Sequence, residues 1–153
     1  MRSTLARAQT ELARLRSTIA TDAPTVVFRA VDTDENQSLL TLAGTEFDGD
    51  LDEVVVLDVV DKAIRSLFAQ TRHAVLHGGR AGGKTESTIR YLTGLAYSRP
   101  TRVLVAREVI STLRDSLVAG FRDLIESVPE FEEHFEVLET EVRGANGSLI
   151  TFI

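Results

Sequence analysis

The sequence predicts an α/β fold in which helices flank a parallel central sheet, preceded by a mixed, partly helical extension. From residue 73 onward the chain alternates strand, loop, helix, strand and helix, an order typical of parallel strands joined by helices. Thr101–Ala106 is a near-continuous apolar run, as expected for a strand buried in a parallel sheet. The chain has 153 residues and is 43% hydrophobic, which suffices for one domain with a substantial core.

Residues 1–61 are expected to form an N-terminal extension of unknown function. A helix is predicted over residues 4–19, either packed on its own domain or paired with a partner. Apolar residues recur there every three or four positions, at Leu5, Ala8, Leu12, Leu15 and Ile19. Residues 25–31 are rich in β-branched side chains and predict a strand, and Leu39–Leu42 is compatible with a second strand.

The stretch from residue 45 to residue 61 is strongly acidic. Asp48, Asp50 and Asp52 alternate as at the start of a calcium-binding loop. Such a loop needs glycine where this chain has Glu53 and glutamate where it has Val59. We therefore interpret this stretch as a solvated acidic surface rather than a metal site.

The region from residue 54 to residue 106 predicts a helix, a short strand, a second helix and a second strand. Val54–Phe68 begins with a run that is also compatible with a strand, but helical spacing favours a helix, through Val56, Val60, Ile64 and Leu67. A short strand is expected at His73–His77, and a helix from the glycine-rich loop to about Ser98, which Pro100 ends. The strand at Thr101–Ala106 then follows.

The last fifty residues predict one more helix and a hairpin. One apolar stripe marks the helix, at Ile110, Leu113, Leu117, Phe121 and Leu124. Residues 136–153 are interpreted as strands around the turn Gly144–Gly147.

A complete phosphate-binding motif, Gly-x₄-Gly-Lys-Thr, lies between the strand at residues 73–77 and the helix that follows. It comprises Gly78, Gly79, Arg80, Ala81, Gly82, Gly83, Lys84 and Thr85. Glycines let backbone N–H groups close around phosphate oxygens, and the following helix directs its positive end at the same anion. Lys84 is expected to contact the β- and γ-phosphates, and the Thr85 hydroxyl to bind Mg²⁺. Glu86 occupies the first helical turn, where an acidic residue suits the helix dipole.

These features predict that residues 62–153 are a P-loop NTPase domain that binds ATP and Mg²⁺. A P-loop ATPase also needs an acidic residue at the end of a later apolar strand. No strand after Lys84 ends in this way, and Asp58, which ends a suitable run, precedes the motif. We therefore expect only the N-terminal part of such a domain, truncated before the acidic Walker B strand and nearly inactive alone.

The charge distribution indicates an anionic ligand in the middle of the chain. Residues 62–122 hold eleven of the 17 Lys and Arg and three acidic residues, a balance of 11 − 3 = +8, although the whole chain carries −6. These arginines could equally lie on solvated helix faces. The absence of cysteine excludes disulfides and Cys-based zinc sites, and no apolar run could span a bilayer.

The stretch from Arg72 to Ile153 resembles the N-terminal ATPase domain of tailed-phage terminase large subunits, the motors that pump DNA into procapsids. The resemblance rests on the arginine-bearing loop and on three segments that follow it in order: Arg102–Glu108, Ser111–Ser116 and Asn146–Ile153. Terminases continue with an acidic ATPase strand, a coupling motif and a nuclease domain. The chain is therefore expected to be a fragment.

The resemblance implies an ATPase that couples ATP hydrolysis to DNA translocation in the host cytoplasm. Its implied partners are double-stranded DNA, the terminase small subunit, the portal and procapsid, and further copies of the full-length subunit, with no membrane. Arg80 would join Lys84 as a catalytic residue near the γ-phosphate. Arg107 and Ser116 would lie at the nucleotide-sensing or DNA-facing edge of the sheet. The adenine would be contacted near Gln70, Arg72 and His73.

Two other functions are compatible with the same residues. One is another P-loop ATPase acting on DNA, such as a helicase-like or repair protein. The other is a non-catalytic nucleotide-binding assembly module, in which the helix at residues 4–19 pairs with a partner.

Overall fold

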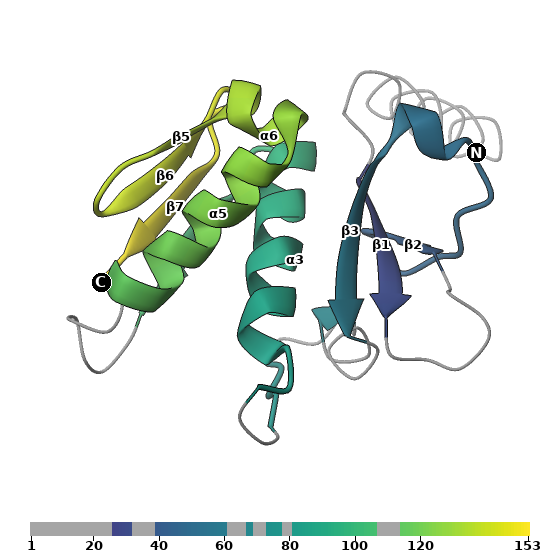
Figure 1. The fold of residues 1–153 in the computed structure, drawn as a ribbon, viewed down its shortest axis with the longest axis horizontal. Coiled ribbons are helices and arrows are strands. Elements are labelled where there is room, and N and C mark those ends of the chain that lie inside the picture. The colour runs from purple at the N-terminus through teal and green to yellow at the C-terminus, as the bar shows by residue number, and fades with distance from the viewer. Residues whose placement is uncertain (1–25, 32–38, 61–66, 69–72, 78–80, 107–113) are drawn as a thin grey trace, which may run out of the picture.

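The computed structural model describes residues 26–31, 39–60, 67–68, 73–77, 81–106 and 114–153. These residues form a mixed α/β structure with two separate sheets. Helix α3 (Lys84–Ser98) lies between them, with β1 and β3 on one side and α5 and the C-terminal strands on the other (Figure 1). The predicted helix at residues 4–19 lies outside the described residues.

The first sheet has the order β2-β1-β3. Strands β1 (Val26–Val31) and β2 (Leu39–Thr41) are antiparallel and confirm the two strands predicted before residue 45. Strand β1 is also parallel to β3 (Val55–Val60). The short 3-10 helix η1 (Leu51–Glu53) connects β2 to β3.

The prediction of a helix over Val54–Phe68 is wrong at its start, because Val55–Val60 forms strand β3. Four of these six residues are valines, which favour extended backbone, and burial alternates along the strand as a half-buried strand requires. Every residue of β3 pairs in register with β1, from Val26 opposite Val55 to Val31 opposite Val60. This long-range pairing overrides the helical spacing.

The second sheet has the order β4-β7-β6-β5. Only β4 (Arg102–Val105) and β7 (Leu149–Phe152) are parallel, since β6 (Glu141–Gly144) pairs antiparallel with both β7 and β5 (Phe135–Val137). The hairpin predicted around Gly144–Gly147 is confirmed. The described residues therefore form two mixed sheets instead of the expected parallel central sheet.

Strand β4 occupies the edge of its sheet, contrary to the buried position that its apolar sequence predicts. Among the described strands it pairs with β7 alone, and Leu104 is 62% exposed. The strand predicted at His73–His77 is also wrong, because these residues join neither sheet and Val75 is 79% exposed. Beside the start of α3, where this strand was expected, the structure places the end of β3.

The core joins both sheets through α3. Gly94 of α3 lies against Val26, Phe28 and Leu57 of the first sheet, while Ile89 lies against Gly120 at the start of α5 (Ala119–Ser127). The predicted apolar stripe is confirmed in the part that the structure describes, where Phe121 and Leu124 are buried. A π-helical turn, η2 (Arg114–Val118), precedes α5.

A short helix that the sequence patterns did not reveal, α6 (Pro129–His134), covers the end of the second sheet. It begins with proline at its first position, where the missing N–H costs nothing. Its Phe131 and His134 rings contact Tyr97 of α3 edge to face. In the part of the chain that the structure describes, no helix has the length and apolar character needed to cross a membrane.

Candidate functional site

The described end of the glycine-rich loop runs directly into α3. Gly83 is the N-cap residue, with φ of 66° and ψ of 2°, and Ala81 has φ of 59°. Glycine adopts this left-handed conformation readily, whereas alanine does so at a cost of about 1–2 kcal/mol. Such strained backbone is concentrated at ligand-binding loops. The first three loop residues, Gly78, Gly79 and Arg80, lie outside the described residues.

The N-terminus of α3 is suited to an anion. Its first intrahelical hydrogen bond runs from the Ser87 N–H to the Gly83 carbonyl oxygen, at 2.9 Å. Gly83 has no side chain with which to cap the first turn. The first-turn N–H groups of any helix have no acceptor within the helix, and the dipole places partial positive charge there. Lys84 is half-buried at this end, and Thr85 is exposed.

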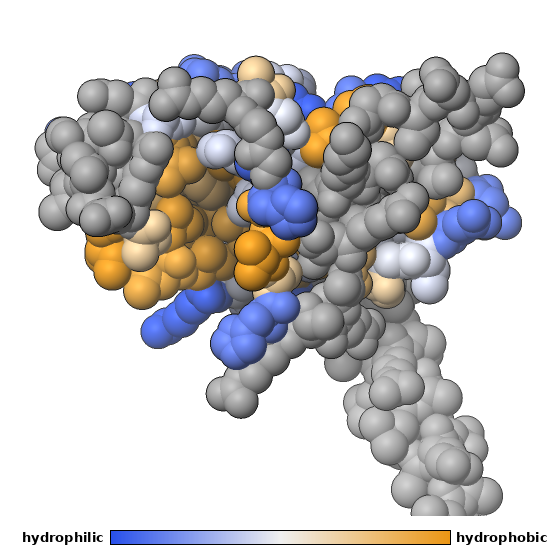
Figure 2. Space-filling view, turned by 90° about the horizontal axis from the view of Figure 1, so that it is seen from below, coloured by the Kyte–Doolittle hydropathy of each residue, from blue (hydrophilic) through white to orange (hydrophobic). Residues whose placement is uncertain are grey.

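Lys84 and Thr85 also line a cavity of about 330 Å³. The other lining residues are Leu76, Thr88, Ile89, Leu92, Val105, Leu117 and Phe121. Figure 2 shows apolar side chains gathered on its left, which is the side where Figure 1 draws α5 and β7. Most residues that line the cavity are apolar. Its charged and hydroxyl groups belong to Lys84, Thr85 and Thr88, in the first turns of α3.

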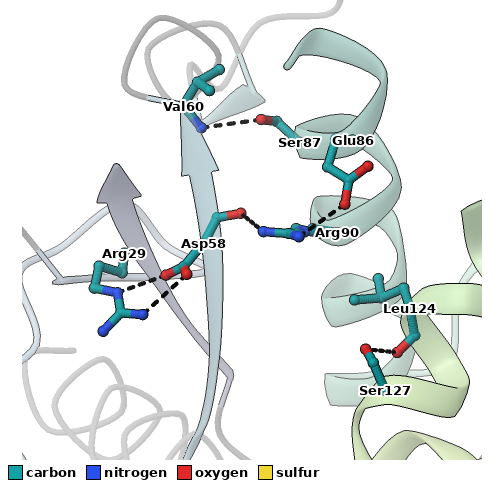
Figure 3. A network of polar contacts seen from close by, with 8 residues as sticks. All are labelled: Arg29, Asp58, Val60, Glu86, Ser87, Arg90, Leu124 and Ser127. Carbon is teal, nitrogen blue, oxygen red and sulfur yellow. Dashed lines mark hydrogen bonds and ion pairs between the residues drawn. The ribbon is translucent and has the colours of Figure 1, made fainter. Parts of the chain in front are cut away.

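A polar network attaches the first two turns of α3 to β3 (Figure 3). The Val60 N–H donates to the Ser87 Oγ at 3.1 Å, and Arg90 Nη1 donates to the Asp58 carbonyl oxygen at 2.6 Å. Arg90 Nη2 also donates to Glu86 Oε1 at 2.8 Å, one helical turn back. Glu86, predicted as a cofactor-binding residue, is thus engaged along its own helix.

The side chain of Asp58 lies on the face of β3 that is opposite α3. Its carboxylate accepts two hydrogen bonds from Arg29 of β1, at 2.6 and 3.0 Å, and Figure 3 shows it pointing away from α3. The hydrogen bond and the charge of Asp58 raise the pKa of Arg29.

The remaining predicted site residues are only partly within the described ranges. Ser116 and His73 are described and exposed, while Gln70, Arg72 and Arg107 lie outside the described residues. In the acidic stretch, Asp50 caps η1 by accepting from the Asp52 N–H at 3.0 Å. Within the described ranges, no group of three or more His, Cys, Asp or Glu side chains could hold a metal ion.

Two contact residues of this site, Val60 and Ser87, were not predicted from the sequence. They are 27 residues apart, and nothing local to either position indicates the contact. The Glu86–Arg90 pair did have a signal, because opposite charges four residues apart face each other on a helix.

Comparison with known proteins adds one match. The family model for the phage terminase large subunit matches residues 70–153, which is more than half of the chain. No curated protein and no solved structure matches the chain. The matched range contains the glycine-rich loop, α3, β4 and the hairpin of β6 and β7. The chain therefore belongs to the phage terminase large subunit family.

Proposed function

We propose that this chain binds ATP and Mg²⁺ through Gly78–Thr85, as the nucleotide-binding part of an ATPase that packages phage DNA. The family supplies the packaging role. The observation that carries ATP binding is the complete motif, whose last glycine adopts a left-handed conformation and caps a fifteen-residue helix that begins at Lys84. A P-loop NTPase fold is the architecture that this motif favours.

In this proposal, different residues of the loop contact different parts of Mg·ATP. Backbone N–H groups of Gly78–Gly83 would surround phosphate oxygens, and Lys84 would supply positive charge to the β- and γ-phosphates. Thr85 offers an exposed hydroxyl, an oxygen ligand of the kind that Mg²⁺ accepts. Arg80 would stabilise charge at the γ-phosphate. Bound Mg·ATP supplies the phosphoryl group, and these side chains hold and orient it.

The partners that we propose follow from the family. They are double-stranded DNA, the terminase small subunit, the portal and procapsid, and other copies of the full-length subunit, all in the host cytoplasm. The family match disfavours a helicase-like or repair ATPase. A non-catalytic nucleotide-binding module remains the second candidate, because no carboxylate is among the described residues that line the cavity with Lys84 and Thr85.

The Lys84→Ala variant tests the proposal. A hydrogen bond from a charged group to phosphate contributes on the order of 2–3 kcal/mol, so the affinity for Mg·ATP should fall roughly 30–150-fold. Isothermal titration calorimetry measures this affinity, and circular dichroism checks that the fold is intact. Arg122→Ala is the matched control, since it removes an exposed positive charge from α5 and should leave the affinity unchanged. An unchanged affinity in Lys84→Ala would remove the assignment of Gly78–Thr85 as the phosphate site.

A further inference from the structure

The last residue of β3, Val60, contacts the glycine-rich loop at the point where α3 begins. We propose that β3 positions the phosphate-binding loop, with Val60 and Ser87 as positioning residues for nucleotide binding. This inference rests on the proposed function. It also goes beyond the family match, because Val60 lies outside the matched range of residues 70–153.

Ser87 joins the loop to the strand. Its side chain is almost fully buried, at 2% exposure, and its Oγ accepts the Val60 N–H at 3.1 Å. Its own N–H donates to the Gly83 carbonyl oxygen at 2.9 Å. One residue therefore bonds both to the end of β3 and to the last glycine of the loop. A buried hydrogen bond of this kind is costly to leave unmade.

The Val60 side chain provides a second, steric contact. A Cβ atom added to Gly83 would lie 2.6 Å from Val60 Cγ1, closer than real Cβ contacts occur. Gly83 is thus required by its left-handed backbone and also by the closeness of Val60. Val60 limits how far Gly83 can move toward β3, and Lys84 follows Gly83 directly in the chain.

The strand that makes these contacts is itself firmly placed. All six residues of β3 pair with β1, and the Arg29–Asp58 ion pair joins the two strands on their other side. One turn beyond Ser87, Arg90 donates to the Asp58 carbonyl oxygen at 2.6 Å. Successive contacts at Val60 and Asp58 therefore fix both the position of α3 along β3 and its rotation about its own axis.

This arrangement predicts reciprocal coupling between the nucleotide and the first sheet. If β3 holds the loop in its binding conformation, then bound nucleotide must stabilise the contact with β3 by the same factor. Mg·ATP should therefore slow amide hydrogen exchange in residues 55–60 more than in β6 of the second sheet. Nucleotide that binds only the folded chain also slows every exchange that requires global unfolding, so the comparison with the second sheet isolates the local effect.

The test combines two variants of α3 with hydrogen exchange of the 153-residue chain. Ser87→Ala should weaken Mg·ATP binding about 5–10-fold, the loss expected for one buried hydrogen bond. Thr93→Val is the matched control. It also removes a fully buried hydroxyl from α3, and the Thr93 Oγ1 has no hydrogen-bond partner within the described structure, so the affinity should stay within twofold of that of the unaltered chain.

Hydrogen exchange of the unaltered chain does not depend on whether a variant folds. Slowing by Mg·ATP that is larger at residues 55–60 than in β6, and absent in Lys84→Ala, would support the positioning role. Equal slowing in β3 and β6, unchanged exchange at residues 55–60, or a Ser87→Ala affinity within twofold of that of the unaltered chain would overturn the inference. If Lys84→Ala still lost binding in that case, the proposed function would stand. Failure of the unaltered chain to bind Mg·ATP would overturn both.

Discussion

The backbone carbonyl and the carboxylate of Asp58 point to opposite sides of β3. Its carbonyl oxygen accepts from Arg90 of α3, while its carboxylate is held by Arg29 of β1. At 40% and 35% side-chain exposure, the Arg29–Asp58 pair is partly screened by water and contributes modestly to stability. Its main consequence is geometric, because it keeps the acid directed away from the glycine-rich loop.

His134 is the residue that should make stability depend on pH near neutrality. Burial lowers its pKa below the ordinary value of 6.5, although a hydrogen bond with Asn146 opposes part of this shift. Its ring contacts Tyr97 and Phe135, with centroids 4.8 and 4.7 Å away, and its buried Nε2 has no hydrogen-bond partner in the described part of the chain. The folded state therefore favours the neutral imidazole.

The sign of the effect follows from linkage. Below 6.5 the unfolded chain binds the proton more readily than the folded chain, so the free energy of unfolding falls as the pH falls. We expect His134→Phe, which keeps an aromatic ring, to remove this loss. Urea unfolding of both proteins at about pH 7.5 and about pH 5.5 measures the difference. Equal pH dependence in both would assign the effect to other groups.

At the scale of elements, Gly94 permits the close packing of α3 on the first sheet. A Cβ atom there would lie 2.9 Å from Phe28 Cζ, 3.0 Å from Val26 Cγ1 and 3.2 Å from Leu57 Cδ1. Gly94→Ala gains about 1 kcal/mol of helix propensity, but overpacking a core costs about 1–3 kcal/mol. We expect a net loss of stability of about 1 kcal/mol, measured by urea unfolding.

Gly120→Ala is the matched control for this packing. A Cβ atom there would meet only Ile89 Cδ1, the flexible end of one side chain, at 2.8 Å. Helix propensity should then prevail, and stability should stay the same or rise by a few tenths of a kcal/mol. If Gly94→Ala were as stable as Gly120→Ala, the close approach of α3 to the first sheet would be wrong.

The elements that the sequence predicts correctly are those with local signals. Gly144–Gly147 identifies the hairpin, because Gly147, with φ of 87°, supplies a turn conformation that few other residues adopt. β-Branched residues identify β1. Strand β3 was missed because valines at four-residue spacing fit a helix equally well, and only pairing with β1, some thirty residues earlier, decides the matter.

The same limit applies to the candidate site. The loop motif is contiguous in sequence, so it could be identified from residues 78–85 alone. The strand expected at residues 73–77 depends on which strands lie beside it, and the structure places the end of β3 next to the start of α3. Whether a short apolar run becomes a strand is set by its neighbours rather than by its own composition.

At the scale of the whole molecule, the middle of the chain carries net positive charge and its flanks carry net negative charge. If the basic block of residues 62–122 contacts duplex DNA, binding should be weak, independent of sequence and strongly dependent on salt. We expect the affinity for a short duplex to fall roughly tenfold or more between about 50 and 200 mM salt, measured by fluorescence anisotropy. An affinity that does not change with salt, or no binding at low salt, would instead favour the interpretation that these arginines lie on solvated helix faces.

Turnover depends on groups from the whole molecule, and we predict that this chain binds ATP but barely hydrolyses it. Among the residues that the structure describes, no carboxylate lines the cavity with Lys84 and Thr85, and the nearby acids Asp58 and Glu86 are engaged by Arg29 and Arg90. Without a general base to orient and deprotonate water, the rate should fall about 10²–10⁴-fold below that of a complete site.

Phosphate release by the 153-residue chain under saturating Mg·ATP measures this rate. We expect turnover far below about 1 s⁻¹, the lower end of usual enzyme rates. Sustained turnover at or above that rate, abolished by Lys84→Ala, would show that a catalytic acid is present. Asp58→Asn would then separate the possibilities, since it keeps a hydrogen-bonding group facing Arg29 while removing the charge. Loss of turnover in this variant would require the Arg29–Asp58 pair to open during catalysis.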